Sequence, residues 1–329
     1  MPRPRVFITR PIMDLGIKLL KKSCTVRMYS QDRLIPRREL LKGVQWADAL
    51  LCLLTDTIDR EVIDANPKLK IISNYAIGFN NIDVAYATQK GLPVTNTPGR
   101  GIVDAVAEHT FALLLTATKR IHEADQFVRR GRFKSWEPKL FLGMELIGKT
   151  IGIVGLGRIG SGVARRAKAL GMKVIYYDVK RNQDFEKEFQ AGYYPFKELL
   201  KTADLVSLHV PLLPSTHHLM GRTELSLMKK TAYLINTSRG PVVDEKELVR
   251  ALKKKQIAGA GLDVYEFEPR LAPGLVTLPN VVLTPHLASA TVEARTEMSL
   301  DAAENILAVL QGKKPRFIVN PEVYGKSRS

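Results

Sequence analysis

Cysteine is scarce in this chain of 329 residues, which contains only Cys24 and Cys52. The two form no C-x-x-C pair and no cluster with other metal-binding side chains, so the sequence argues against a disulfide scaffold and predicts no metal site. Sparse, unclustered cysteine is typical of a reducing compartment. We therefore expect a cytoplasmic protein.

Long apolar runs are missing as well. The longest, at 49–54 and 111–115, are too short to span a bilayer. The opening residues lead directly into a predicted strand, so we expect neither a targeting segment nor a membrane-spanning one. With 45% hydrophobic and 25% charged residues, the composition is that of an ordinary globular protein, and the length suits about two domains.

Acidic residues are outnumbered: 50 lysines and arginines against 33 aspartates and glutamates give a net charge of +17. Such an excess occurs in proteins that bind nucleic acid or other anions. Here the basic residues stand in pairs and triplets within helical patterns, for example at 129–130 and 253–255. No helix-turn-helix, zinc-finger or RNA-recognition pattern accompanies them, so we favour solvated helix faces over a nucleic-acid interface.

What the sequence does contain is a regular alternation of β-branched runs and helical stretches, which predicts parallel strands joined by crossover helices. In the first hundred residues the predicted strands are 6–9, 48–53, 69–73 and 92–95. One long helix is predicted over 102–130. Six strands follow, at 151–154, 173–177, 205–208, 232–236, 259–263 and 281–284, and a last helix at 291–310. Six parallel strands with intervening helices are typical of a doubly wound nucleotide-binding sheet.

A G-x-G-x-x-G motif lies between the first of these six strands and the helix after it. Gly155 permits a tight turn, Gly157 lets the backbone approach a pyrophosphate, and Gly160 allows the helix to pack closely on the strand. The N–H groups at the start of that helix point toward the phosphates. The motif and its context predict a dinucleotide site.

The second of the six strands ends at Asp178, eighteen residues after Gly160. A carboxylate here accepts hydrogen bonds from the adenosine ribose and repels a 2′-phosphate, so we expect NAD(H) to be preferred over NADP(H). Lys180 and Arg181 follow closely. Either one is able to pair with a 2′-phosphate, so NADP(H) stays open.

Three residues at strand ends have the chemistry of keto-acid reduction. Ligands of such sheets bind outside the carboxyl ends of the strands, where Arg239, Glu268 and His286 are expected. A guanidinium is able to clamp a carboxylate and its neighbouring carbonyl, and an imidazole beside a carboxylate is suited to donate a proton. Taken singly, each residue also has a structural explanation as a cap, a loop charge or a core histidine.

Seven strings, taken together and in this order, are far more specific. They are NYAIGFNNID at 74–83, VTNTPG at 94–99, GIVGLGRIG at 152–160, HVPL at 209–212, NTSRG at 236–240, GLDVYE at 261–266 and TPHLASA at 284–290. Nearly the whole chain resembles the D-isomer-specific 2-hydroxyacid dehydrogenase family, and most closely its glyoxylate/hydroxypyruvate reductase branch.

The resemblance implies a role for each matching residue. Arg239, Glu268 and His286 match the catalytic residues, and the backbone of Ile77 and Gly78, with Arg239, matches the group that holds the substrate carboxylate. His286 also matches a cofactor contact. The other matches to cofactor contacts are Gly155, Gly157, Arg158, Ile159, Gly160 and Asp178 at the phosphates and ribose, His209, Val210 and Pro211 at the adenine and ribose, and Thr237, Ser238 and Asp263 near the nicotinamide.

By the same resemblance, an α/β fold of two doubly wound parallel-sheet lobes is expected. A Rossmann NAD-binding domain at 101–289 is inserted in a flavodoxin-like substrate domain made of 1–100 and 290–329. The implied reaction is NAD(P)H-dependent reduction of glyoxylate or hydroxypyruvate to glycolate or D-glycerate. The family usually forms homodimers, and the predicted helix at 102–130 with the loop at 133–142 is the expected contact surface.

Three alternatives stay open. One is a 3-phosphoglycerate dehydrogenase-like enzyme, whose anionic substrate would suit the basic surplus. Another is a different D-2-hydroxyacid dehydrogenase. The third belongs to another class, an NAD-sensing corepressor built on the same scaffold, because fold alone does not define function.

Overall fold

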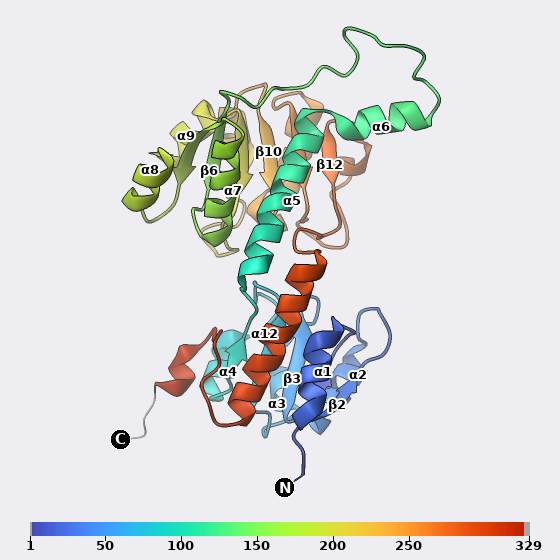
Figure 1. The fold of residues 1–329 in the computed structure, drawn as a ribbon, viewed down its shortest axis with the longest axis vertical. Helices are drawn as coiled ribbons and strands as arrows, with labels where there is room; N and C mark the ends of the chain where they lie inside the picture. Colours follow the sequence, from blue (N-terminus) through green and yellow to red (C-terminus); the bar gives the residue numbers. More distant parts are fainter. Residues whose placement is uncertain (1, 326–329) are drawn as a thin grey trace. The chain divides into compact units, whose positions relative to one another are not determined.

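The structure is a computed structural model that describes residues 2–325, and it divides into two compact units. Unit 1 consists of residues 1–102 and 290–329, and unit 2 of residues 103–289. Each unit is built on one parallel sheet (Figure 1), so the α/β class with two doubly wound sheets is confirmed.

Unit 1 has a five-stranded sheet in the order β2-β1-β3-β4-β5, which is the flavodoxin-like order. Helices α2, α3 and α4 pack on one face, and α1 and α12 cover the other. Its elements are β1 (Arg5–Ile8), α1 (Asp14–Ser23), β2 (Thr25–Met28), α2 (Arg37–Trp46), β3 (Ala49–Leu53), α3 (Arg60–Asp64), β4 (Ile71–Tyr75), α4 (Val84–Gln89), β5 (Val94–Thr95), α12 (Val292–Leu310) and η3 (Pro321–Tyr324).

The last long helix returns to the sheet of the first hundred residues. Thr291 caps α12 by accepting a hydrogen bond from the N–H of Ala294. The Ser73 hydroxyl on β4 donates to the carbonyl of Ala302 at 3.2 Å, and Gly16 of α1 lies directly against Ser299. Unit 2 is therefore an insertion between two parts of unit 1.

Unit 2 has a seven-stranded, fully parallel sheet in the order β12-β11-β10-β9-β6-β7-β8. Helices α5, α7 and α8 pack on one face and α9, α10 and α11 on the other. Its elements are α5 (Arg100–Thr118, which begins in unit 1), α6 (Ile121–Arg129), β6 (Thr150–Val154), α7 (Arg158–Ala169), β7 (Lys173–Tyr177), α8 (Gln183–Phe189), β8 (Gly192–Tyr193), α9 (Phe196–Thr202), β9 (Leu205–Leu208), α10 (Arg222–Leu227), β10 (Tyr233–Asn236), η1 (Gly240–Val242), α11 (Glu245–Lys253), β11 (Gly259–Leu262), η2 (Leu275–Thr277) and β12 (Val281–Leu283).

The prediction of one helix over 102–130 is wrong. The chain forms α5 and then α6, with a break at Lys119 and Arg120, because Arg120 adopts a left-handed backbone conformation with φ of 56°. The prediction also missed β2, an edge strand that is mostly exposed, and β8, which has only two residues.

Helix α5 is, among residues 2–325, the one helix long and apolar enough to cross a membrane by length and composition. Helices buried in a protein core meet the same criteria. Half of its apolar window is buried, and Phe111, Leu113 and Leu114 pack with Ile151 and Ile153 in the core of unit 2. This packing explains its apolar composition as that of a core helix.

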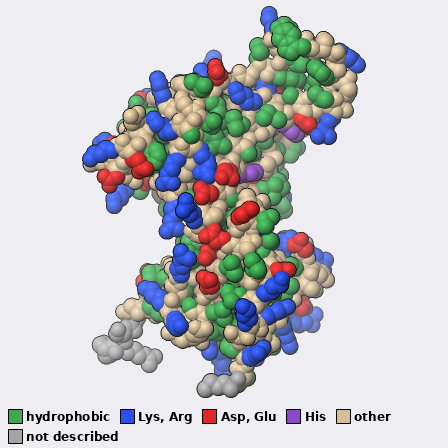
Figure 2. Space-filling model, viewed as in Figure 1, with side chains coloured by type: hydrophobic (Ala, Val, Ile, Leu, Met, Phe, Trp, Pro, Cys, Tyr) green, Lys and Arg blue, Asp and Glu red, His purple; other side chains and the backbone are tan. Residues whose placement is uncertain are grey.

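The basic surplus is dispersed. On the face in Figure 2, Lys and Arg side chains lie over both units and alternate with acidic ones. Two arginines each contact two carboxylates: Arg37 pairs with Asp59 and Glu61, and Arg166 with residues 104 and 108 of α5.

Candidate active site

The glycine-rich turn follows β6 and opens α7. Gly155 has φ of +94°, and a Cβ there would lie 2.9 Å from the carbonyl group of His209. A Cβ on Gly160 would collide with the carbonyl oxygen of Gly155, so helix and turn are packed as closely as glycine allows. A Cβ on Gly157, by contrast, would meet no atom within 4 Å. The turn is thus closed toward the protein and open at Gly157, where α7 begins with Arg158 and Ile159.

Asp178 follows β7 and contacts the same turn. Its Oδ2 accepts a hydrogen bond from the N–H of Leu156 at 2.7 Å, and Oδ1 accepts one from the N–H of Lys180 at 3.2 Å. Arg181 turns to Glu186 instead, with its Nη2 2.7 Å from Oε2. The carboxylate therefore lies beside the glycine turn, as the motif predicts.

His209, Val210 and Pro211 follow β9, on the other side of the turn. The Nε2 atom of His209 lies 2.8 Å from the Ser207 hydroxyl, and burial lowers the pKa of His209 to about 3, so the imidazole is neutral. Its Nδ1 is buried and has no hydrogen-bond partner among the residues that the structure describes. An open glycine turn, a helix N-terminus, a carboxylate beside that turn and an unpartnered ring nitrogen together fit a dinucleotide.

Arg239 follows β10 in a loop organised by Asn236. The Asn236 amide donates to the Arg239 carbonyl at 3.0 Å, and its oxygen accepts from both the N–H and the hydroxyl of Ser238. The Arg239 guanidinium donates to the Ser238 carbonyl at 2.6 Å. Burial lowers the pKa of Arg239 and the charge of Glu268 opposes that change, and the side chain stays charged because an arginine pKa starts far above neutrality.

Glu268 and His286 form a direct pair. The Nδ1 of His286 lies 2.9 Å from Oε2 of Glu268, and the other carboxylate oxygen accepts from the N–H of Tyr265 at 3.0 Å. Burial acts to raise the pKa of Glu268, but the bonds from His286 and Tyr265 and the charges of His286 and Arg239 outweigh it and hold that pKa below its usual range. The carboxylate is therefore ionised, and Nε2 of His286 is the ring nitrogen that faces away from it.

Asp263 holds the segment that carries His286. This side chain is 0% exposed, and its oxygens accept from the Thr284 hydroxyl at 2.6 Å and from the N–H groups of Leu287 at 2.7 Å and Ala288 at 2.8 Å. Burial acts to raise the pKa of Asp263, and these bonds with one from His109 lower it overall. The backbone N–H of His286 also donates to the Asp263 carbonyl at 2.9 Å. Asp263 thereby fixes His286 in its left-handed conformation, with φ of 56°.

Two residues of helix α5 contact the segments that follow strands β10, β11 and β12. His109 places Nε2 3.0 Å from the Thr284 hydroxyl and 3.4 Å from Oδ1 of Asp263. At the next residue, the hydroxyl of Thr110 lies 2.9 Å from that of Thr237. Neither helix residue was predicted as part of the site, and neither was Thr284. The available signal was a histidine and a threonine side by side, directly before the apolar run at 111–115.

Ile77 and Gly78 lie in unit 1, in the loop after β4. The Asn96 amide donates to the Ile77 carbonyl at 2.7 Å, and the Asn74 amide donates to the Gly78 carbonyl at 2.8 Å. Two side-chain amides therefore fix the peptide planes of this loop. The structure thus groups Arg239, Glu268 and His286 within unit 2, and orders Ile77 and Gly78 separately within unit 1.

A dinucleotide-binding sheet with an acid-paired histidine and an arginine at its strand ends defines the class as a nicotinamide-dependent oxidoreductase. The model of the D-isomer specific 2-hydroxyacid dehydrogenase NAD-binding domain matches residues 111–288. A glyoxylate reductase of Thermococcus litoralis is 50% identical over 329 residues, which is 99% of this chain and 99% of that protein. The chain belongs to the D-isomer specific 2-hydroxyacid dehydrogenase family.

Three solved structures superpose on nearly the whole chain. A protein of Thermus thermophilus superposes with a TM-score of 0.90 at 42% identity, covering 96% of this chain and 99% of that one. An NADPH-dependent glyoxylate/hydroxypyruvate reductase of Sinorhizobium meliloti, solved with NADP and malonate, gives 0.83 at 30% identity, with 96% and 97% covered. A D-lactate dehydrogenase of Aquifex aeolicus, solved with NAD and lactic acid, gives 0.84 at 32% identity, with 96% and 99% covered.

The Asp263 network predicts the effect of Asp263→Asn. The side-chain amide nitrogen would replace one of the two oxygens that accept hydrogen bonds, so it would face a donor with no acceptor. We therefore expect the free energy of unfolding to fall by about 1–3 kcal/mol, and kcat to fall with it. The folded-state pKa of Asp263 is lowered, so its contribution is present above the ordinary aspartate pKa and is lost as the pH falls. Urea unfolding should therefore show a difference from wild type that shrinks in acid. Asp184→Asn, an exposed site in α8, is the control; equal effects of the two changes would refute the network's role.

Proposed function

We propose that the protein reduces glyoxylate to glycolate with a reduced nicotinamide dinucleotide. The observation that carries the proposal is the His286–Glu268 pair, with Arg239 close enough for its charge to lower the pKa of Glu268. Identity of 50% to a glyoxylate reductase over nearly the whole chain supports it. Hydroxypyruvate carries the same carbonyl and carboxylate groups, and it is the second substrate we propose.

The glycine turn and the start of α7, with Arg158 and Ile159, would hold the pyrophosphate, and Asp178 the adenosine ribose. The residues that we assign to the adenine and nicotinamide ends are His209, Val210, Pro211, Thr237, Ser238, Asp263 and His286. When bound, the reduced nicotinamide supplies the hydride.

His286 supplies the proton. Its Nδ1 faces the ionised Glu268, which stabilises the imidazolium and fixes the ring, so the proton is delivered from Nε2 to the carbonyl oxygen of the substrate. Arg239 binds the substrate carboxylate and its neighbouring oxygen through the guanidinium fork. We assign the backbone N–H groups of Ile77 and Gly78 to the same carboxylate.

The function is tested by NADH oxidation with four keto acids: glyoxylate, hydroxypyruvate, pyruvate and phosphohydroxypyruvate. We expect the largest kcat/KM for glyoxylate or hydroxypyruvate, because the assigned groups recognise a small 2-keto acid and include no site for a phosphate. A preference for phosphohydroxypyruvate would instead establish the phosphoglycerate dehydrogenase-like alternative. No turnover of any of them would contradict the proposal.

The proton donor is tested by His286→Gln and Glu268→Gln. The first change should lower kcat by about 10²-fold to 10⁴-fold, since it removes the acid, while NADH binding measured by fluorescence is retained. The second removes the carboxylate that accepts from Nδ1 and fixes the ring, so kcat should also fall while NADH binding is retained. A full rate in either variant would remove the changed residue from its proposed role.

NAD(H) is the cofactor we propose, over NADP(H). Asp178 presents a carboxylate at the expected ribose position, and Arg181, one of the two cations able to pair with a 2′-phosphate, is held by Glu186 through two hydrogen bonds. A carboxylate repels the phosphate, and the Arg181 guanidinium already donates to Glu186 from two of its nitrogens, so it attracts a phosphate less strongly. The same keto-acid panel, repeated with NADPH, measures the preference directly.

We place the protein in the reducing environment of the cytoplasm. Cys24 and Cys52 are buried free thiols, and burial raises the pKa of each. Thiols of this kind stay protonated and take no part in disulfide exchange.

A homodimer formed through α6 and the loop after it is also proposed. All nine residues of α6 are described, and none is buried. On this helix and in the segment that leads from it to β6, large apolar side chains are exposed: Ile121, Val128, Phe133, Trp136, Leu142 and Ile147. The segment extends away from the sheet of unit 2 (Figure 1), with Phe127 and Phe141 in edge-to-face contact at 5.3 Å. An ordered apolar surface of this kind is typical of a protein interface.

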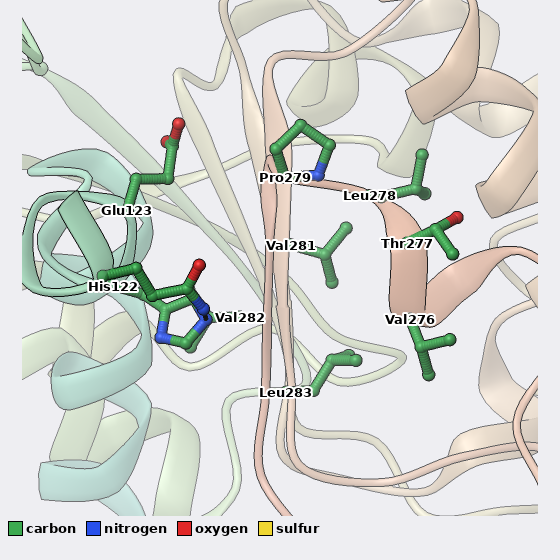
Figure 3. A pocket seen from close by; sticks show the side chains of 10 residues that line it. His122, Glu123, Val276, Thr277, Leu278, Pro279, Val281, Val282 and Leu283 are labelled. Carbon is green, nitrogen blue, oxygen red and sulfur yellow. Dashed lines mark hydrogen bonds between the residues drawn. The ribbon is translucent and has the colours of Figure 1, made fainter. Parts of the chain in front are cut away.

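The hollow beside α6 suits the same partner. A cavity of about 310 Å³ lies between His122, Glu123 and Gln126 of α6 and the apolar side chains of η2 and of β12 at the sheet edge (Figure 3). Six of its ten lining residues are apolar, and none of the ten is assigned to chemistry. We assign it to the second copy of the chain rather than to the substrate.

Light scattering after gel filtration tests the dimer. We expect the mass of two chains for the wild type and of one chain for Val128→Glu/Trp136→Glu, because two buried carboxylates would each lose their hydration at the interface. Leu34→Glu, an equally exposed leucine of unit 1, is the control and should remain dimeric. A monomeric wild type, or a double variant that stays dimeric, would show that this surface has another role.

A further inference from the structure

A histidine–histidine–glutamate cluster lies outside the residues assigned to catalysis. His217 and His218 belong to the turn after β9, and Glu266 lies in the loop after β11. One ligand atom from each of the three lies within 4.8 Å of the other two. Nothing in the proposed reduction uses them.

The backbone brings the two neighbouring histidines to the same side. His218 has φ of 51°, in the left-handed region, and its N–H donates to the Pro241 carbonyl at 2.8 Å. The two imidazoles are consequently face to face, with ring centres 4.0 Å apart and an angle of 32° between the planes. Adjacent side chains usually diverge, and here both present ring nitrogens to one place.

Glu266 completes the cluster and is itself held in position. Its Oε1 is 2.7 Å from Nε2 of His218, while Oε2 accepts from the N–H of Glu245 at 3.2 Å. The Glu266 N–H in turn donates to the Glu245 side chain at 2.7 Å. On the far side of the His218 ring, Nδ1 lies 4.0 Å from a carboxylate oxygen of Asp244. Outer carboxylates and backbone groups of this kind orient metal ligands in proteins.

We infer that His217, His218 and Glu266 bind a divalent transition-metal ion of the Zn²⁺ type. Two imidazoles and one carboxylate are a common zinc set, with water in the remaining position. Mg²⁺ and Ca²⁺ prefer oxygen ligands alone, so the two nitrogens select against them. His217 is exposed, which gives the ion access from solvent. The ion replaces the hydrogen bond between His218 and Glu266 with two metal–ligand bonds.

Binding here joins two separate loops. The turn at 213–220 becomes linked to the loop at 264–268, in which Glu268 lies two residues beyond Glu266. The ion therefore stabilises the folded state of unit 2 in proportion to its occupancy and supplies nothing to the hydride or proton transfer.

The test uses untagged full-length protein and Co²⁺ as a spectroscopic probe. We expect visible d–d absorption that saturates at one Co²⁺ per chain and disappears when Zn²⁺ is added. His217→Phe keeps an aromatic ring beside His218 and leaves the His218–Glu266 bond intact, and it should weaken Co²⁺ binding by at least about tenfold. His122→Phe, an exposed histidine of α6, is the control and should bind as the wild type does.

A thermal-melting measurement provides the second readout. Zn²⁺ should raise the Tm of the wild type and of His122→Phe by a few degrees, and leave His217→Phe unchanged. Absence of saturable Co²⁺ binding, or binding and melting shifts that are equal in His217→Phe and wild type, would overturn the inference. Both readouts are independent of keto-acid turnover, so their failure would leave the proposed function unaffected.

Discussion

The buried carboxylate of Asp263 is the interaction on which the rest of the candidate site depends. An ionised carboxylate with no exposed surface is unfavourable unless it is fully hydrogen-bonded, and this one is surrounded by donors from the turn after β12 and from α5. A buried, ionised carboxylate thus fixes the turn after β12, in which His286 has a left-handed backbone conformation. His286 stays in its left-handed conformation because both sides of it are tied to the end of β11.

The fold could be predicted wherever the pattern of apolar residues is strong. The strands β6, β7 and β9 are short, mostly buried and mostly apolar runs, and the predicted bounds agree with them to within one residue. The pattern fails where burial is slight. β2 lies at a sheet edge with only one residue even half-buried, and its four residues include only two apolar ones, too few for a clear pattern. The end of α5 also could not be predicted, because the left-handed Arg120 has a side chain that ordinarily continues a helix.

The reactive side chains of the candidate site could be predicted from the sequence, but the residues that hold them in position could not. Parallel strands bring their carboxyl ends to one edge, so Arg239, Glu268 and His286 could be grouped from sequence, and the structure places Glu268 against His286 and near the charge of Arg239. Asp263 contacts His109, which lies more than 150 positions earlier in the chain, and Thr284, which lies about 20 positions later. No local pattern encodes such packing. The stacked histidines of the turn after β9 were hidden for a related reason, since their arrangement depends on the backbone of His218.

The charges of the proposed site couple substrate binding to proton supply. Glu268 is an anion that contacts the ring of His286 and lies close enough to Arg239 for the guanidinium charge to lower its pKa. With His286 protonated, the three together carry one positive charge, and a keto acid brings the single negative charge that balances it. With His286 neutral, the same substrate would leave a net negative charge in a partly buried site, which is unfavourable. In the proposed site, a keto acid would therefore bind better when His286 is protonated, and by linkage its binding would favour that form. The form of the site that accepts the substrate would then be the one that already holds the proton which reduction consumes.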